Sequence, residues 1–111
     1  MIEIEVRKFL AEQLSVPVYM EEPEDPPARY VILEKVGGGK SNGLKTATIT
    51  AQSYGSSLYE AAMLNEELKE AMEVIDNQDP ISRAELNSDY NFTDTETNRY
   101  RYQAVFDLIY Y

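Results

Sequence analysis

The sequence predicts an α+β fold in which two helices lie on one face of an antiparallel or mixed β-sheet, in the order α-β-β-β-α-β-β. Residues 58–75 place apolar side chains at three- and four-residue steps, which is typical of an amphipathic helix. Residues 100–110 alternate between apolar and polar side chains, as a half-buried strand does. A chain of 111 residues has the usual size of one domain, so we expect a single core over residues 1–111.

The first helix is predicted over residues 3–14. Four apolar side chains lie on one side of it at helical spacing: Val6, Phe9, Leu10 and Leu14. A strand is the alternative, because residues 2–6 also alternate between apolar and acidic side chains. We favour the helix.

A short strand and an acidic loop are predicted next. Residues 16–20 form a strand entered through Pro17, which suits an edge position where the missing N–H does no harm. Residues 21–27 contain four acidic residues and three prolines, so they are expected to form an extended surface loop. This loop is also a candidate docking arm, with Glu22 and Asp25 as candidate contacts to a neighbouring subunit.

A β-hairpin is predicted from two strands. Residues 29–36 are rich in β-branched and aromatic side chains, and residues 46–54 alternate between apolar and polar side chains. Residues 37–43 would form the glycine-rich tip of a long, mobile hairpin that reaches a neighbour. Gly38, Lys40 and Asn42 are therefore candidate contacts to that neighbour. A phosphate-binding loop is a poor alternative, because the required glycine-lysine spacing and a following helix are both missing.

The second helix begins with a predicted capping box, in which Ser57 and Glu60 satisfy the first free N–H groups. Its buried side is predicted to hold Leu58, Ala61, Leu64 or Asn65, Leu68, Met72 and Ile75. Residues 76–80 end it.

Two more strands are predicted at residues 81–90 and 100–110, joined as an antiparallel pair by the polar segment 91–98. The last strand is partly apolar on both faces near its end, which indicates burial against another subunit. Tyr110 and Tyr111 are candidate contacts there, since tyrosine is a common interface anchor. Tyr100 and Tyr102 could equally pack against the helices of their own chain.

The composition argues against an enzyme and against bound cofactors or metals. The chain has no cysteine and no histidine, which removes thiolate nucleophiles, zinc sites of the usual kind and the common hydrolase triad. Residues 89–93 begin like a calcium loop, but Asp94 stands where that loop needs glycine. A carboxylate enzyme remains an alternative, and it would need a pocket with a perturbed Glu or Asp.

The formal charge of −10 predicts that nucleic acids and anionic membranes are repelled. Residues 56–111 are the acidic half, with twelve Asp or Glu against four Lys or Arg. A solvated acidic face is the simplest interpretation, and a channel lining or a docking surface for a basic partner is the alternative. The acidic N-terminus and the lack of a long apolar run predict a protein without a signal peptide or membrane span, inside the cell.

The chain resembles the small tail-completion proteins of phages and prophages, the tail terminator and tail-to-head joining group of long-tailed phages. The resemblance spans nearly the whole chain and rests on Glu-Leu-Asn-Ser-Asp-Tyr-Asn-Phe at 85–92, Arg-Tyr-Arg-Tyr-Gln-Ala-Val-Phe-Asp at 99–107, and shorter matches at 52–54, 61–62 and 64–66. The expected element order is also that of the group.

The resemblance implies a homo-hexameric ring that caps the tail tube, stops its growth and joins the tail to the head connector. It implies the tail tube protein and the head connector protein as partners, and a location in the bacterial host cytoplasm and then at the head–tail junction of the virion. An acidic channel would let DNA pass without binding it.

Two other functions stay open at this point. A head-proximal connector or another minor virion protein would share the assembly role and dock on the portal side. An acidic inhibitor that mimics DNA would explain the charge, and would bind a basic protein as a monomer or dimer.

Overall fold

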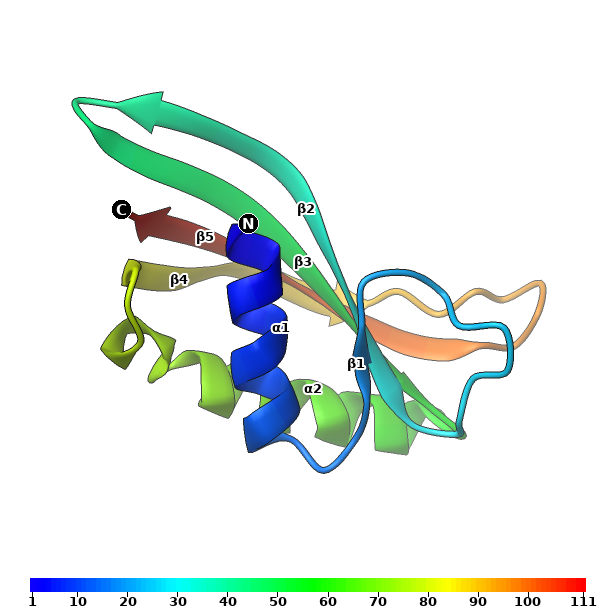
Figure 1. The fold of residues 1–111 in the computed structure, drawn as a ribbon. Helices are drawn as coiled ribbons and strands as arrows, with labels where there is room; N and C mark the ends of the chain where they lie inside the picture. Colours follow the sequence, from blue (N-terminus) through cyan, green and yellow to red (C-terminus); the bar gives the residue numbers. More distant parts are fainter.

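The computed structural model describes residues 1–111 except the side chain of Ser41. The elements are α1 (Ile2–Gln13), β1 (Val18–Tyr19), β2 (Tyr30–Ser41), β3 (Leu44–Gly55), α2 (Leu58–Met72), the short 3₁₀ helix η1 (Ile75–Asn77), β4 (Ile81–Asn91) and β5 (Tyr100–Tyr110), as Figure 1 shows. The α+β class and the predicted order of elements are confirmed.

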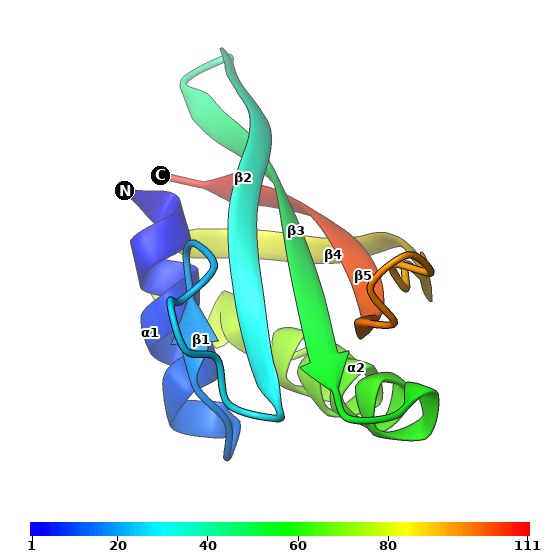
Figure 2. The ribbon, with the colours of Figure 1, turned by 90° about the vertical axis from the view of Figure 1, so that its right-hand side faces the viewer.

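The five strands form one mixed sheet in the order β1-β2-β3-β5-β4. The β1–β2 pair is parallel and the other three pairs are antiparallel. Both helices lie on the same face, α1 against β1 and β2 and α2 against β3 and β5 (Figure 2). The predicted placement of both helices on one face is therefore confirmed, and the other face of the sheet is left open.

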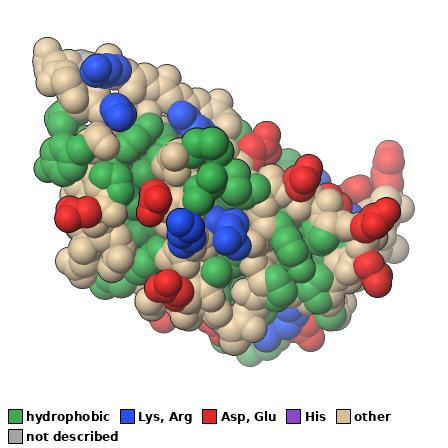
Figure 3. Space-filling view, viewed as in Figure 1, with side chains coloured by type: hydrophobic (Ala, Val, Ile, Leu, Met, Phe, Trp, Pro, Cys, Tyr) green, Lys and Arg blue, Asp and Glu red, His purple; other side chains and the backbone are tan. Residues whose placement is uncertain are grey.

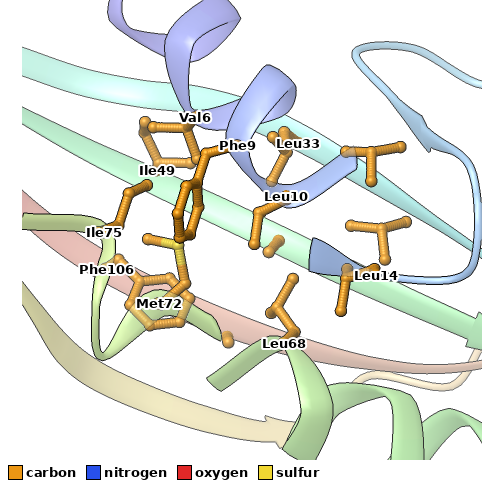
Figure 4. Close-up of a cluster of buried hydrophobic side chains, with 14 of the residues drawn as sticks. Val6, Phe9, Leu10, Leu14, Leu33, Ile49, Leu68, Met72, Ile75 and Phe106 are labelled. Atoms are coloured by element: carbon orange, nitrogen blue, oxygen red, sulfur yellow. The ribbon is translucent and has the colours of Figure 1, made fainter. Parts of the chain in front are cut away.

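The core lies between this helical layer and the sheet (Figure 4). Val6 and Leu10 of α1 and Leu68 of α2 are fully buried against the inward side chains of the strands, such as Ile49. These inward positions alternate along each strand, as the pleat requires. Burying them supplies the main favourable free energy of folding.

The N-terminal segment is a helix, and the strand alternative is wrong. The apolar residues that alternate at its start, Ile2 and Val6, are buried together with Phe9 on the side that faces the sheet. A guanidinium nitrogen of Arg7 donates to the carbonyl oxygen of Val18 at 3.2 Å, which ties α1 to β1. The helix begins and ends one residue earlier than predicted.

The strand predicted at residues 16–20 is only two residues long. Val18 and Tyr19 pair in parallel with Val31 and Ile32, and the N–H of Val31 also donates to the carbonyl oxygen of Pro17 at 3.0 Å. Pro17 has no N–H to donate, which limits the pairing on that side. The edge position expected from Pro17 is confirmed.

The predicted long hairpin is present, but its turn is much shorter than the predicted residues 37–43. Gly37, Gly38 and Gly39 continue β2 and pair with β3, and the turn consists of Asn42 and Gly43 alone. Both turn residues have positive φ, 50° and 83°, which matches the twist of a two-residue hairpin. The three preceding glycines suggest a turn from the sequence alone, but glycine also adopts the extended backbone of a strand.

The capping box of α2 is confirmed. The N–H of Glu60 donates to the Ser57 hydroxyl at 3.2 Å, and the Glu60 carboxylate accepts from the N–H of Ser56 at 3.2 Å. Two predicted features differ in the structure. Leu58, in the first turn of α2, is 41% exposed, and Ile75 is buried from η1, since α2 ends at Met72.

The C-terminal strands pair antiparallel over nearly their whole length, and residues 92–99 connect them as predicted. The register of β4 shifts at two places, between Ile81 and Arg83 and between Leu86 and Ser88. Such bulges are common in edge strands, and β4 is an edge of this sheet.

Replacing Gly55 with alanine should destabilise the fold by about 1–3 kcal/mol, because the added Cβ would lie 2.6 Å from the backbone nitrogen of Ala61 in α2. Gly37→Ala is the matched control, since its Cβ meets only the Thr48 side chain at 3.9 Å or more. The control should change stability by less than about 1 kcal/mol. Urea denaturation of both variants measures the difference, and equal midpoints would contradict the close packing of β3 on α2.

Candidate functional site

An aromatic and cationic cluster lies on the open face of the sheet. The rings of Tyr30 and Tyr54 stack with their centroids 4.4 Å apart and their planes 3° from parallel. The guanidinium group of Arg99 lies 5.0 Å from the Tyr54 ring, and Tyr19 contacts Tyr30 edge-on. The stacking helps to explain why two tyrosines on a helix-free face are only 2% and 5% exposed.

Glu22 fixes the acidic loop to this cluster. Its carboxylate accepts from the Tyr30 hydroxyl at 2.9 Å and from the Arg99 guanidinium at 2.6 Å, and Arg99 also donates to the Tyr30 hydroxyl. Burial, and then the hydrogen bond to Glu22, raise the pKa of Tyr30 above its ordinary value. The loop is thus held against its own sheet at this residue, while Asp25 is exposed.

The β2–β3 hairpin projects away from the rest of the chain and contributes to an elongated shape of 44 × 25 × 24 Å (Figure 1). β1 pairs only with Val31 and Ile32. From Leu33 to the turn, β2 therefore has β3 as its sole partner among the described residues, so its outer edge is open. Gly38, Lys40 and Asn42, the candidates in this segment, are all exposed.

Three lysines lie on one face of the hairpin. Lys40 pairs with Lys45, and Lys35 pairs with Ile49, whose side chain points into the core. Because residues paired across strands share a face, and Lys45 is four positions from Ile49, all three lysines point to the helix side. None of them forms an ion pair within the part of the chain that the structure describes. Lys and Arg side chains gather over the projection at the upper left of Figure 3.

The C-terminal tyrosines lie near the tip of the hairpin, where Tyr110 pairs with Lys45. Tyr110 packs against the core and its ring lies 5.9 Å from the Lys45 ammonium nitrogen. Tyr111 is 66% exposed, and its N–H donates to the carbonyl oxygen of Pro80 at 3.1 Å. Tyr111 is therefore the residue of the pair that is free to contact another molecule.

A groove of about 310 Å³ runs between α2 and β4. Three glutamates of α2 line one wall, Glu66, Glu70 and Glu73, together with Lys69, whose ammonium group forms an ion pair with Glu66 at 2.9 Å and leaves Glu70 and Glu73 without an ion pair among the described residues. Its apolar lining includes Leu86, which points to the helix side of β4 but is 45% exposed because α2 does not reach over it. The outer edge of β4 borders this groove and, in the described chain, pairs with no other strand.

A polar contact holds β4 to α2 beside this groove. The Asp89 carboxylate accepts from the Lys69 ammonium group and from the amide of the buried Asn65, both at 2.9 Å. The hydrogen bond from Lys69 lowers the pKa of Asp89, and the same bond raises the pKa of Lys69. The contact fixes the distance between the glutamates and the β4 edge.

The seven candidate residues fall into two groups at opposite ends of the sheet. Gly38, Lys40, Asn42, Tyr110 and Tyr111 lie at the hairpin end, and Glu22 and Asp25 lie in the loop at the other end (Figure 1). Sequence reasoning missed the alignment of the three lysines. Lys40 and Lys45 are equidistant from Asn42-Gly43, so recognising this dipeptide as a two-residue turn would have paired them.

The segment that begins like a calcium loop takes another role in the structure. Asp89 binds Lys69, and Asn91 accepts from the N–H and hydroxyl of Thr93, so the start of the calcium-like segment is used within the fold. Among the described residues, no cluster of three or more potential ligands could hold a metal ion. In the same part of the chain, no helix is long and apolar enough to span a membrane.

Comparison with known proteins found no matching family model and no matching curated protein. The function is therefore argued from the surfaces described above.

Glu22→Ala should free the acidic loop, because it removes both the ion pair with Arg99 and the acceptor of the Tyr30 hydroxyl. Amide hydrogen exchange should become several-fold faster in residues 20–29, while global stability falls by less than about 1 kcal/mol, as is usual for a half-exposed ion pair. Glu24→Ala, in the same loop and exposed, is the control. Unchanged exchange in the Glu22 variant would show that the loop is held by other contacts.

Asp89→Asn should lower stability at neutral pH by about 1–2 kcal/mol. The folded pKa of Asp89 is lowered, so the carboxylate stabilises the fold above its ordinary pKa of 3.8, and this contribution is lost as the pH falls through the folded value. The difference between wild type and variant should therefore shrink in acid. Urea denaturation between pH 7 and pH 2 measures it, and Lys69→Met should make the Asp89 substitution nearly neutral. A difference that is constant with pH would contradict this account.

Proposed function

We propose that this protein is a structural subunit of a phage tail, which assembles into a homo-hexameric ring that caps the tail tube and joins it to the head connector. The observation that carries the proposal is the projecting β2–β3 hairpin with its open outer edge. A chain that extends an uncovered, lysine-bearing hairpin past its own core has a surface suited to a neighbouring subunit.

The two open edges of the sheet support a ring. The β2 edge and the β4 edge differ in sequence, shape and charge, so a contact between them joins unlike surfaces of two copies. Contacts of this heterologous kind close into rings when the rotation between copies allows it. The resemblance to tail-completion proteins supplies the ring size and the partners.

The charge distribution agrees with a ring through which DNA passes. The net charge is −10, and phosphate binding scales with the number of cations that a surface presents. The virion location, at the head–tail junction, belongs to the same proposal.

The second candidate is an acidic inhibitor that mimics DNA. The glutamates along α2 favour it, because they form an exposed row beside a groove. An inhibitor of this kind would work as a monomer or dimer, whereas a tail terminator must assemble. The state of association therefore distinguishes the two functions.

The protein should form a species of six times the 12.7 kDa mass of one chain, visible as a six-fold ring. Light scattering coupled to size-exclusion chromatography over a range of concentrations measures the mass, and negative-stain microscopy shows the shape. A chain that remains monomeric at the highest concentration would contradict self-assembly and favour the inhibitor.

A shortened hairpin provides the matched variant. Deleting Gly39, Lys40, Lys45 and Thr46 removes two paired positions from each strand and keeps the Asn42-Gly43 turn and the face of every other residue. The variant should keep the circular dichroism and cooperative unfolding of the wild type and lose the ring.

A further inference from the structure

We infer that the β2–β3 hairpin of one copy adds its free β2 edge to the free β4 edge of the next copy, with its lysines against the glutamates of α2. This inference rests on the proposed function, because it names the contact by which the ring would close. The occupant of the groove between α2 and β4 is thus a second copy of this chain.

The first argument is the backbone. Beyond Ile32, β2 is hydrogen-bonded on one side only, and β4 is hydrogen-bonded only to β5 in the described chain. A row of unpaired N–H and C=O groups along a strand is a template for another strand. Residues 34–40 on one copy and residues 81–91 on the next are long enough to pair over several residues.

The second argument is strand direction. From β2 across the sheet, the direction alternates through β3 and β5 to β4, so β4 runs opposite to β2. When a second copy continues the sheet in the same orientation, its β2 lies antiparallel to β4. Head-to-tail addition therefore gives the favourable antiparallel ladder, and both copies keep their helices on the same side.

The third argument is charge. In that orientation the lysine-bearing face of the hairpin lies on the helix side of the neighbour, which is where Glu66, Glu70 and Glu73 line the groove. Residues 33–46 contain three lysines and one acidic residue, whereas residues 58–91 contain nine acidic residues and two basic ones. Complementary potentials of this kind select a partner and fix its register.

The fourth argument is apolar surface. Leu86 in the groove is 45% exposed on the helix side of β4. A β2 strand of a second copy that pairs with β4 would cover this side chain, and its burial adds to the hydrogen bonds of the ladder.

Cross-linking of engineered cysteines tests the contact, since the wild-type chain has no cysteine to interfere. Lys40→Cys and Glu70→Cys are prepared singly, as a mixture and as a double variant, and treated with a flexible bismaleimide. The mixture should give covalent dimers and the double variant a ladder of higher species, while neither single variant cross-links. Lys40→Cys with Glu12→Cys is the control, because Glu12 is exposed on α1, beneath the other edge of the sheet.

Three other outcomes overturn the inferred contact, and a fourth supports it but overturns the proposed ring. Cross-linking of Lys40→Cys with itself would show a contact between two hairpins, and cross-linking with Glu12→Cys as efficient as with Glu70→Cys would show collision without a defined interface. Rings without the expected cross-link would overturn the contact and leave the proposed ring. The expected cross-link in dimers or filaments would support the contact and overturn the ring.

Charge reversal gives an independent test that does not depend on cross-linker geometry. Replacing Lys35, Lys40 and Lys45 with glutamate should lower the association constant by about tenfold or more. Because Lys35 and Lys45 line a pocket with Glu3 and Glu5 of α1, circular dichroism and urea denaturation check that this variant folds like the wild type. Mixing this variant with Glu66→Lys/Glu70→Lys/Glu73→Lys should restore association between the two, measured by light scattering. Unaltered association of the lysine variant alone, or no recovery in the mixture, would contradict the inference.

Discussion

The pairing of β3 on both of its edges is the constraint on which the rest of the structure depends. β2 pairs with it on one side over Tyr30–Ser41, and β5 pairs with it on the other over Tyr100–Tyr110. Its inward side chains Ala47, Ile49 and Ala51 are at most 2% exposed, so the same strand carries the helical layer. Because β5 supports β3 as far as Lys45, the hairpin can extend beyond the core while its backbone bonds stay satisfied on the inner side.

Most of the fold could be predicted from the sequence because periodicity records which side of an element is buried. The helical spacing of apolar residues predicts α2, the capping box predicts where α2 begins, and the alternation in residues 100–110 predicts β5. The sequence does not predict the outer part of β2, residues 37–41, because Gly37, Gly38 and Gly39 have no side chains from which a period can be read. The register of β2 against β3 could not be predicted either, because pairing partners depend on the position and length of the turn that joins the strands. The placement of the three lysines on one face follows from that register and was therefore also not predicted.

The two ends of the sheet differ in how many of their charged and aromatic side chains have partners within the same chain. At one end the acidic loop closes on the sheet through Glu22, and the buried rings of Tyr30 and Tyr54 need no further partner. At the other end the hairpin lysines form no ion pair among the described residues, although Lys35 and Lys45 share a pocket with Glu3 and Glu5 of α1, and Tyr111 stays exposed. The loop was considered a docking arm from its composition, but composition does not show which charges are already paired inside one chain.

The distribution of charge carries more information about function than its total. A uniform charge of −10 would repel a second copy from every direction, and at physiological ionic strength this repulsion is screened beyond about 8 Å. Contacts between lysine and glutamate act within that distance, so the approach of the hairpin to α2 of a neighbour is favoured over any contact between two acidic faces. The proposed inhibitor function does not account for the lysine-bearing hairpin on the opposite edge of the sheet, whereas the proposed ring uses both surfaces. In the proposed head-to-tail ring, each subunit needs two different surfaces: the hairpin that contacts one neighbour, and the groove between α2 and β4 that binds the hairpin of the other neighbour.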